Sequence, residues 1–388
     1  MLPYLKELSK NGFQFTILSF EKKDRYKNEN SIVKNITDAA HIRWIPVWFT
    51  SKPPVLSKML DRWKLKRAAL KIFKQEKFDM VHCRSYVAAE AGLELKKKFK
   101  TKFLFDMRGF WPDEKKDGGS WNQANPFFRQ LYKYYKRKEI QYLQNADQII
   151  VLTEAAKREI LKWPGYNPKV PLKVIPCCTD MCLFSLADRE QKLKARESLG
   201  LSADSLVISY LGSVGSWYML DQMLIFFEKL KINFPSAKFL FITHTVRCVI
   251  DQKIKELNFD KNDFIITRAT RKEVPFVVKA SDINIFFIKP VYSKISSSPT
   301  KLGEVLAMGI PIICNKGVGD VDSIVRNADA GFVLNKFSDA NYEEAIRHIP
   351  ALLKKSPSDI RNAIKDIYSL EKGAQLYLSC YREILSQQ

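Results

Sequence analysis

The stretch SSSPTKLGEVLAMGIPIIC, residues 296–314, decides the fold, because it reads as a helix followed directly by a buried strand. Ser298 suits the N-cap, where a side-chain oxygen accepts a backbone amide, and Pro299 suits the first helical position, where no N–H is needed. Gly309 then ends the helix, and Pro311 prevents its continuation. The apolar residues at the end of the stretch predict a short strand inside a sheet.

Two residues of this helix break local rules. Lys301 places a cation in the first turn, where the helix dipole is positive, and Gly303 costs about 1 kcal/mol relative to alanine. A phosphate at the helix start would remove the first conflict, because the free amides, the dipole and the ammonium would face one anion. Glu304, one turn further, would hold a pair of ribose hydroxyls. The pattern alone leaves open the alternative of a solvated lysine and glutamate on an ordinary amphipathic helix.

The order S-P-T-K-L-G-E, followed by A-M-G-I-P, resembles the nucleotide-sugar signature of retaining glycosyltransferases of family 4. This resemblance implies the GT-B architecture, an α/β fold in which two Rossmann-like domains face each other across a cleft. It also implies that Glu304 binds the ribose and that the helix start receives the donor diphosphate, through Ser298, Pro299, Thr300, Lys301 and Leu302.

A second phosphate-binding segment is expected at Gly212-Ser213, where the stretch 207–215 reads as a buried strand that runs into a glycine-rich turn. A tight turn that needs glycine is the alternative, because the spacing does not match GxGxxG. The family often carries an Arg or Lys pair in and after this loop, where this chain has Ser-Trp-Tyr at 216–218. Lys301 would then carry most of the cationic role. Ser296 stands where many members carry a glutamate near the transferred sugar.

Two rounds of alternating strands and helices predict two domains with a boundary near residue 180. We expect residues 1–180 to form an acceptor-side Rossmann-like domain and residues 181–372 to form the nucleotide-sugar domain. The final helix, 373–388, is expected to pack back on the first domain. Residues 2–8 resemble the helix that follows the first strand and glycine-rich loop of the family. We therefore expect the first domain to lack its initial strand, with a truncated reading frame as the leading explanation.

The composition describes a folded protein with an excess of positive charge. The 388 residues are 46% hydrophobic, and 64 Lys and Arg against 42 Asp and Glu give a net charge of +22. This excess favours anionic partners such as a nucleotide diphosphate, a lipid headgroup surface or a phosphate-linked acceptor, and nucleic acid is not expected. A lysine-rich soluble protein without such partners is the alternative. No apolar run reaches the roughly 18–20 residues of a membrane-spanning helix, and the cysteines lack the spacing of a zinc site.

A basic helix is expected over residues 56–74. Its apolar residues share one face, and its other positions carry lysines and arginines against a single acid, Asp61. Such a helix either lies on an anionic membrane surface or presents a solvated face over a buried stripe. We expect a cytoplasmic protein, with peripheral contact to the inner face of the plasma membrane as an open alternative. The apolar residues of this face are Leu56, Met59, Leu60, Trp63, Leu70 and Phe73, with Trp44, Trp48 and Phe49 just upstream.

Two further residues outside the signature, Arg108 and Arg268, are candidates for the site. Arg108 follows the strand 103–106, in the turn where many relatives place a histidine near the reacting sugar. It would bind a phosphate or carboxylate, and a structural ion pair is the alternative. Arg268 follows the strand 264–267 and is expected near the base of the nucleotide. Asp320-Val321-Asp322 resembles a DxD metal motif but lies in the wrong type of domain for that use, so we predict no metal site.

These features predict a retaining glycosyltransferase of the hexosyl type. It would move a sugar from a UDP- or GDP-linked donor to a lipid-linked or oligosaccharide acceptor in cell-surface polysaccharide synthesis, without a cofactor. Lys301 and Arg108 would be the catalytic residues, with Lys301 stabilising the charge on the leaving diphosphate. Two alternatives stay open. One is a nucleotide-sugar epimerase of the same fold, and the other is a truncated, non-catalytic protein that binds membranes or polyanions.

Overall fold

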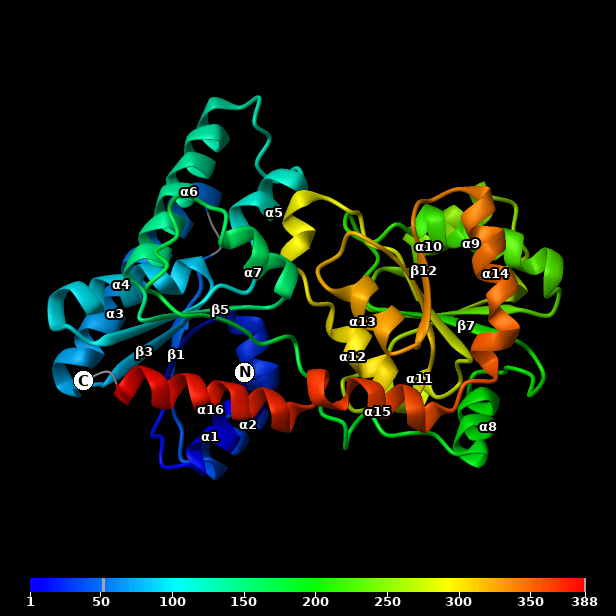
Figure 1. The fold of residues 1–388 in the computed structure, drawn as a ribbon, viewed down its shortest axis with the longest axis horizontal. Coiled ribbons are helices and arrows are strands. Elements are labelled where there is room, and N and C mark those ends of the chain that lie inside the picture. The colour runs from blue at the N-terminus through cyan, green and yellow to red at the C-terminus, as the bar shows by residue number, and fades with distance from the viewer. Residues whose placement is uncertain (51–52, 387–388) are drawn as a thin grey trace.

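A computed structural model describes residues 1–50 and 53–386 of the chain. Two α/β units lie side by side, the first coloured from blue to green and the second from green to orange in Figure 1. Strands and helices alternate along both units, and the strand pairs of the described residues are parallel. Parallel sheets are covered by helices on both faces, which explains why strands such as β7 and β10 are buried throughout and mostly apolar.

The second domain is built on a six-stranded sheet with the order β12-β11-β10-β7-β8-β9. The chain runs outward from β7 to β8 and β9, and then returns to β10 on the other side of β7. The loops after β7 and β10 therefore diverge at the carboxyl ends of neighbouring strands, which is where open α/β sheets bind ligands. The strands are β7 (Val207–Leu211), β8 (Lys238–Ile242), β9 (Phe264–Thr267), β10 (Ile283–Phe286), β11 (Ile312–Asn315) and β12 (Gly331–Leu334).

Helices cover both faces of this sheet, as Figure 1 shows for α9 and α14 on one side of the drawing and α11 and α15 on the other. The helices are α8 (Arg189–Ser198), α9 (Leu220–Asn233), α10 (Arg247–Glu256), α11 (Val274–Val278), α12 (Thr300–Ala307), α13 (Val321–Asn327), α14 (Asp339–Leu353) and α15 (Pro357–Tyr368), with the 3₁₀ turns η1 (Lys261–Asp263) and η2 (Tyr292–Ser296).

The strands of the first domain form a four-stranded sheet, β3-β4-β5-β6, and a separate pair, β1-β2. Strand β5 is buried throughout, whereas every residue of β1 is only half-buried. The strands are β1 (Thr16–Glu21), β2 (Arg43–Trp48), β3 (Met80–Arg84), β4 (Lys102–Asp106), β5 (Gln148–Val151) and β6 (Leu172–Val174). The helices are α1 (Leu2–Ser9), α2 (Lys23–Ala39), α3 (Pro54–Gln75), α4 (Tyr86–Phe99), α5 (Trp111–Asp117), α6 (Pro126–Asn145) and α7 (Glu154–Ile160).

Helix α16 (Leu370–Ser386), red in Figure 1, carries the chain back from the second domain to the first. Its buried face, which includes Tyr377 and Tyr381, packs with Leu5 of α1 and Leu104 of β4. The expected helix 373–388 thus begins at Leu370, and residues 387–388 lie outside the described part of the chain.

The chain crosses between the domains twice, and the two crossings are hydrogen-bonded to each other. The amide of Thr179, on the first crossing, donates to the carbonyl of Tyr368 at 2.7 Å. The amide of Leu370, on the second, donates to the carbonyl of Thr179 at 3.0 Å. The two domains are therefore joined by a short double connection.

Helix α3 turns an apolar part of its surface to solvent. Met59, Leu60 and Trp63 are 60%, 48% and 54% exposed, so for these residues the alternative of a buried stripe is wrong. The buried side instead carries Asp61 and Leu65. Asp61 faces inward because its carboxylate accepts the backbone amide of Thr50, and this contact sets the rotation of the helix. Phe73 is buried, as the buried-stripe alternative predicts for it, and the side chain of Leu56 lies outside the described residues.

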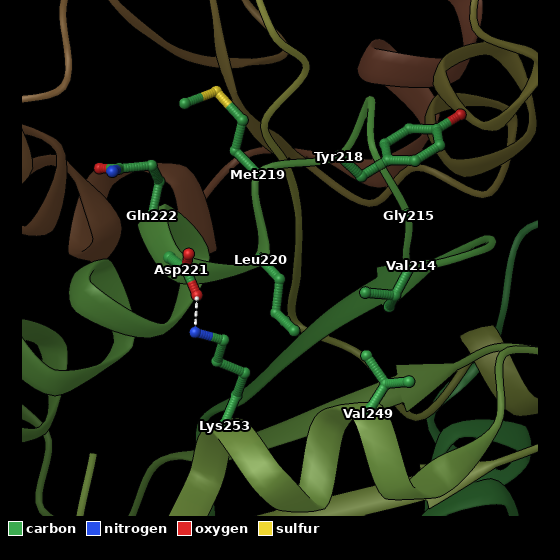
Figure 2. Close-up of a pocket in the computed structure, with 9 residues that line it drawn as sticks. All are labelled: Val214, Gly215, Tyr218, Met219, Leu220, Asp221, Gln222, Val249 and Lys253. Carbon is green, nitrogen blue, oxygen red and sulfur yellow. Dashed lines mark ion pairs between the residues drawn. The ribbon is translucent and has the colours of Figure 1, made fainter. Parts of the chain in front are cut away.

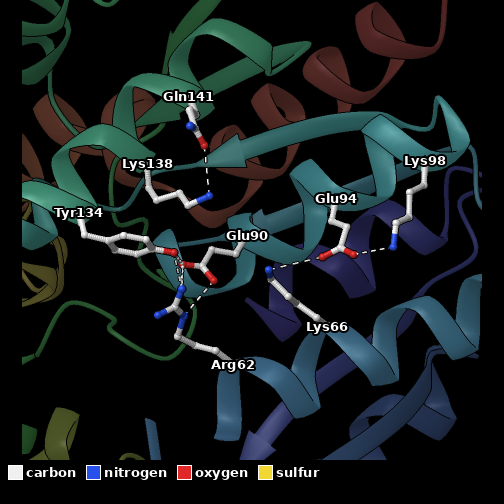
Figure 3. A network of polar contacts seen from close by, with 8 residues as sticks. All are labelled: Arg62, Lys66, Glu90, Glu94, Lys98, Tyr134, Lys138 and Gln141. Atoms are coloured by element: carbon white, nitrogen blue, oxygen red, sulfur yellow. Dashed lines mark hydrogen bonds and ion pairs between the residues drawn. The ribbon is translucent and has the colours of Figure 1, made fainter. Parts of the chain in front are cut away.

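Ion pairs fix this rotation of α3 on the domain beneath it (Figure 3). Arg62 donates two hydrogen bonds to the Glu90 carboxylate of α4, at 2.9 and 2.7 Å. Its guanidinium also lies over the ring of Tyr134 on α6, 5.0 Å from the centroid. One turn further, Lys66 pairs with Glu94 at 3.5 Å. Since Glu90 is almost fully buried, Arg62 holds the helix by a contact that water screens little.

Candidate active site

The signature helix α12 begins at Thr300, with Pro299 as its N-cap. The prediction that Ser298 caps this helix is wrong. The Ser298 hydroxyl instead accepts the backbone amide of Cys177, at 3.2 Å, and so ties the helix start to the first crossing between the domains. Thr300 is exposed and Leu302 is fully buried, so one side of the first turn packs on the core and the other side faces solvent.

Lys301 is the unusual residue of this turn. It is 6% exposed, and its Nζ has no hydrogen-bond partner among the residues that the structure describes. Three aromatic rings surround the ammonium instead, with centroids at 4.2 Å for Tyr210, 3.8 Å for Tyr218 and 5.7 Å for Phe286. Burial lowers the pKa of Lys301 from 10.5 to about 7, and the nearby charge of Glu304 only partly opposes this shift. An anion that enters here would meet a cation with no competing partner.

The glycine-rich turn after β7 approaches this ammonium closely. A Cβ on Gly212 would lie 2.8 Å from Lys301 Nζ, and the φ of Gly212 is +129°, which a residue with a side chain rarely adopts. The carbonyl of Ser213 accepts a hydrogen bond from the Tyr210 hydroxyl at 2.7 Å. The structure thus brings Gly212, Ser213 and Lys301 together where the loops after β7 and β10 diverge.

The other irregular residue, Gly303, has a structural explanation. A Cβ there would lie 2.7 Å from Thr179 Oγ1 and 3.1 Å from the ring of Tyr368. Both neighbours belong to the connection between the domains. Glycine is therefore required for close packing against the crossing, and only Lys301 remains as a local irregularity that points to a ligand.

Glu304 is buried at 7% exposure and pairs with Arg271, which follows β9. The Arg271 guanidinium also lies over the ring of Phe184, 4.6 Å from its centroid. Arg268, expected near the base, lies exposed just beyond β9. The carboxylate proposed for the ribose is therefore occupied by a half-exposed arginine in this structure, and that arginine sits on the same loop as Arg268.

On the first domain, Arg108 leaves the end of β4 with a φ of +60°. Its guanidinium lies 3.9 Å from the carboxylate of Asp106 and donates to the Cys177 sulfur at 3.1 Å. The amide of the same Cys177 donates to the Ser298 hydroxyl, so Cys177 connects Arg108 to the segment just before α12. The structural ion pair that was the alternative role of Arg108 is therefore formed, with Asp106. Arg108 also lies at the domain interface, through its contact with Cys177.

The segment before α12 holds the domains together. The Ser296 hydroxyl accepts the amide of Phe110 and donates to the carbonyl of Ser293, both at 2.8 Å. Lys294 pairs with Glu114 of α5 at 2.8 Å. Ser296 is thus engaged in an interdomain contact at the position where many relatives carry a sugar-binding glutamate.

The DxD-like segment also has an interdomain role. The carboxylate of Asp320 accepts the amides of Glu154 and Ala155, at 2.6 and 2.9 Å, at the start of α7 in the first domain. Within residues 1–50 and 53–386, no group of three or more His, Cys, Asp and Glu side chains is arranged to hold a metal ion.

A surface pocket of about 350 Å³ borders the glycine-rich turn (Figure 2). One side is formed by the turn itself and the other by α10, while Asp221 and Lys253 close the rim with an ion pair at 3.3 Å. Tyr218 therefore contacts the Lys301 ammonium and also lines this pocket. Its lining residues are Val214, Gly215, Tyr218, Met219, Leu220, Asp221, Gln222, Val249 and Lys253.

Sequence reasoning missed Tyr210, Tyr218 and Arg271. The positions 216–218 were noted only as lacking the usual cations, and Tyr210 reads as an ordinary strand residue. For Arg271, the basic run that follows β9 was a usable signal, since it holds Arg268, Arg271 and Lys272. Which arginine of this run pairs with Glu304 depends on how the loop packs against α12.

Comparisons with known proteins agree with the two-domain fold. A family model described as Glycosyltransferase Family 4 matches residues 4–181, and one described as Glycosyl transferases group 1 matches residues 191–366. No curated protein sequence matches the chain.

Solved structures of similar fold include a glycosyltransferase from Rickettsia africae ESF-5, at 19% identity and a TM-score of 0.71, covering 100% of this chain and 94% of that one. HepE from Anabaena in complex with UDP is similar at 13% identity and a TM-score of 0.70, with 98% and 95% covered. WaaG, a glycosyltransferase involved in lipopolysaccharide biosynthesis, is similar at 12% identity and a TM-score of 0.66, with 95% and 98% covered.

Two parallel-sheet domains, matched over almost their whole length by these structures, define the GT-B fold of glycosyltransferases. The two family models, which together span most of the sequence, place the chain more narrowly. It is a glycosyltransferase of the family 4 type.

Proposed function

We propose that this glycosyltransferase takes its sugar from a nucleotide-diphosphate sugar and transfers it with retention at the anomeric carbon. The observation that carries the proposal is the Lys301 ammonium, which is buried at the start of α12 and has no hydrogen-bond partner within residues 1–50 and 53–386. A buried, unpaired cation is costly to keep. A diphosphate is the ligand that would use the helix amides, the dipole and the ammonium together. HepE, a protein of similar fold, has been solved with UDP, so UDP-sugars are the first donors to test.

Each site residue has a role in this proposal. The anomeric C–O bond breaks as negative charge develops on the leaving diphosphate, and Lys301 with the α12 amides stabilises that charge. The acceptor oxygen forms the new bond from the same face and passes its proton to the leaving diphosphate. Glu304 holds the ribose hydroxyls after Arg271 has moved aside. Arg108 binds a phosphate or carboxylate group from the side of the first domain. The proposal needs neither a metal nor a cofactor.

Binding of the donor tests this function directly. Calorimetric titration of the wild-type protein with UDP-, GDP- and ADP-sugars is expected to show binding of one nucleotide class, with a loss of about 100-fold in Lys301→Ala, the size of losing one strong charge contact. Lys354→Ala, which removes an exposed lysine at the end of α14, should bind like the wild type. Failure of a folded wild-type protein to bind any of these donors would refute the proposal. Conversion of the donor to its epimer without acceptor would favour an epimerase instead.

We further propose that the acceptor is a lipid-linked glycan presented at an anionic membrane surface. The support is an exposed aromatic patch on the first domain, formed by Trp48, Phe49, Met59, Leu60 and Trp63, whose side chains are each at least 40% exposed. Basic residues Lys58, Arg67, Lys71 and Lys74 flank it on α3. A basic helix that exposes aromatic residues suits the interface of an anionic bilayer. No helix of the described residues is long and apolar enough to cross a membrane.

Co-sedimentation with lipid vesicles tests the exposed aromatic patch. The double variant Met59→Ser/Trp63→Ser is expected to lower partitioning onto phosphatidylglycerol vesicles by about tenfold or more, because two side chains lose their burial in the interface. Binding should also fall with added salt and be absent on neutral phosphatidylcholine vesicles. Ile232→Ser, on the 77% exposed Ile232 of α9, serves as the control and should bind like the wild type. Equal partitioning of all three proteins would remove the membrane surface from the proposal.

A further inference from the structure

We propose that Tyr218 is a positioning residue of the donor site, whose ring covers the Lys301 ammonium in the free protein and is displaced when a diphosphate enters. This inference rests on the proposed function, since it concerns the same phosphate site. Its starting point is geometric. The Tyr218 ring is the aromatic group nearest to Lys301 Nζ among those in contact with it, at 3.8 Å. It therefore covers part of the ammonium surface that a phosphate oxygen would contact.

Of the two tyrosine rings on Lys301, that of Tyr210 is held by a hydrogen bond, whereas that of Tyr218 is held only by packing, edge-on to Tyr210 with ring centroids 5.8 Å apart. Tyr210 belongs to the buried strand β7, and its hydroxyl is tied to the carbonyl of Ser213. Tyr218 lies in the turn and is partly exposed, and no other described residue makes a hydrogen bond with its hydroxyl. Of the two tyrosine rings that enclose Lys301, Tyr210 is thus fixed by a hydrogen bond, and Tyr218 is the one that can be displaced.

The backbone around Tyr218 is held, so the movement is confined to the side chain. The amide of Lys289 donates to the carbonyl of Trp217, and the amide of Met219 donates to the carbonyl of Phe287, both at 3.0 Å. The pocket of about 350 Å³ shown in Figure 2 lies against the same residue and offers the ring a place to go. In this proposal the ring moves by rotation about its side-chain bonds, while the backbone hydrogen bonds beside it stay in place.

The cover has a consequence for affinity. Cation–π contacts between an ammonium and an aromatic ring have to be given up before a phosphate takes their place, so the free protein binds the donor more weakly than an uncovered site would. For one such contact the expected factor is about 3- to 30-fold in the dissociation constant. Tyr218 thus lowers the donor affinity that the Lys301 ammonium would otherwise provide.

The test follows the reactivity of the Lys301 amine. Acetylation of the intact protein by a water-soluble succinimidyl ester is measured by peptide mass spectrometry in the wild type, Tyr218→Phe and Tyr218→Ala, with Lys354 as the internal reference. Tyr218→Ala is expected to label Lys301 about tenfold faster, because the covering ring is gone. Tyr218→Phe, which keeps the ring, should label like the wild type. Inorganic pyrophosphate and UDP, as probes of the phosphate site, should slow labelling of Lys301 in all three proteins.

Binding of UDP completes the test. Tyr218→Ala is expected to bind UDP about 3- to 30-fold more tightly than the wild type, as the lost cation–π contact predicts. Unchanged labelling in Tyr218→Ala would overturn the cover, and weaker binding of UDP would show that the ring belongs to the occupied site. Faster labelling that neither pyrophosphate nor UDP slows would overturn the phosphate site, and with it the proposed function, while the cover itself would stand.

Discussion

Replacement of Lys301 by methionine is expected to stabilise the ligand-free protein by about 3 kcal/mol near neutral pH, while it weakens donor binding about 100-fold. Burial lowers the pKa of Lys301 from 10.5 to about 7. Converted at about 1.4 kcal/mol per pKa unit, keeping this side chain charged in the folded state costs about 5 kcal/mol. The cation–π contacts, which methionine also loses, offset about 2 kcal/mol of that cost. The remainder is the stability that the protein sacrifices to keep an unpaired cation at this site.

The pH dependence gives this prediction a signature. The unfolded chain holds the Lys301 proton up to about pH 10.5, whereas the folded chain releases it near pH 7. Between these values the unfolded state binds more protons, so the wild type gains stability as the pH rises. The advantage of Lys301→Met should therefore be largest below pH 7 and should fade toward pH 10.5. The groups that face the Lys301 amine are Glu304 and the rings of Tyr210, Tyr218 and Phe286. All of them are kept in Lys301→Met, so the pH-dependent difference between the two proteins comes from the amine itself.

Urea unfolding of Lys301→Met and of the wild type at several pH values measures this difference. Lys354→Met, at an exposed position, should show a small effect that does not vary with pH. A methionine variant that is less stable than the wild type at neutral pH would mean that Lys301 contributes to stability in the free protein. Its assignment to an anion site would then lose its energetic basis.

Replacement of Asp106 by alanine is expected to destabilise the protein by about 3–5 kcal/mol. Asp106 is 0% exposed at the end of β4 and accepts a hydrogen bond from the Tyr377 hydroxyl of α16 at 3.0 Å. His82 lies at 3.4 Å and Arg108 at 3.9 Å from the same carboxylate. Removal of one partner of a buried pair leaves the other charge uncompensated, which carries a cost of this size. Asp251→Ala, which breaks an exposed ion pair with Arg247, should change stability by less than about 0.5 kcal/mol.

Two further measurements separate charge from packing at Asp106. Burial raises the pKa of the Asp106 carboxyl, but the His82 hydrogen bond and the charges of Arg108 and Arg84 outweigh it and hold that pKa below its ordinary value. The stabilisation is thus complete above the ordinary pKa and is lost as the pH falls through the lower folded pKa. The double variant Asp106→Asn/Arg108→Met should recover part of the loss, because no buried charge is left alone. Hydrogen exchange in α16 should accelerate in Asp106→Ala, and an unaffected α16 would contradict the role assigned to Tyr377.

The overall class of this protein could be predicted from one stretch of sequence. The order of residues in 298–311 implied a family 4 glycosyltransferase with the GT-B fold, and both the family models and the solved structures confirm it. Such a stretch is informative because its helix, its chain reversal and its strand are specified by local chemistry. The helix found at Thr300–Ala307 and the strand at Ile312–Asn315 follow that local pattern closely.

Failures of prediction occurred where a distant partner decided the outcome. Ser298 has every local property of an N-cap, but its hydroxyl is taken by Cys177, which is 121 residues away in the chain. The apolar face of α3 was ambiguous because the rotation of that helix depends on Asp61 and Thr50 and on Arg62 with Glu90. Hydrophobic periodicity describes one helix at a time, and these contacts join separate elements.

The enclosure of Lys301 was unpredictable for the same reason. Tyr210, Tyr218 and Phe286 come from a strand, a turn and a second strand that are adjacent only because β7 pairs with β10. The sequence contains the aromatic residues but does not place them around one ammonium. Arg271 on Glu304 is a similar case, because it depends on how the loop after β9 lies against α12.

The double connection between the domains restricts how the enzyme can open. A single flexible linker would let two domains separate and rotate in any direction. Here both crossings pass through one place and are hydrogen-bonded at Thr179, which leaves rotation about that place as the main movement available. Arg108 and the start of α12 both lie beside this pivot, linked through Cys177, so their separation changes little when the domains swing. The interdomain contacts of Ser296 and Asp320 belong to the segments around α12 that meet α5 and α7, and an opening motion has to break them first. If the domains rotate about this connection, Arg108 and the start of α12 are therefore expected to stay close together while the parts of the domains farther from Thr179 separate.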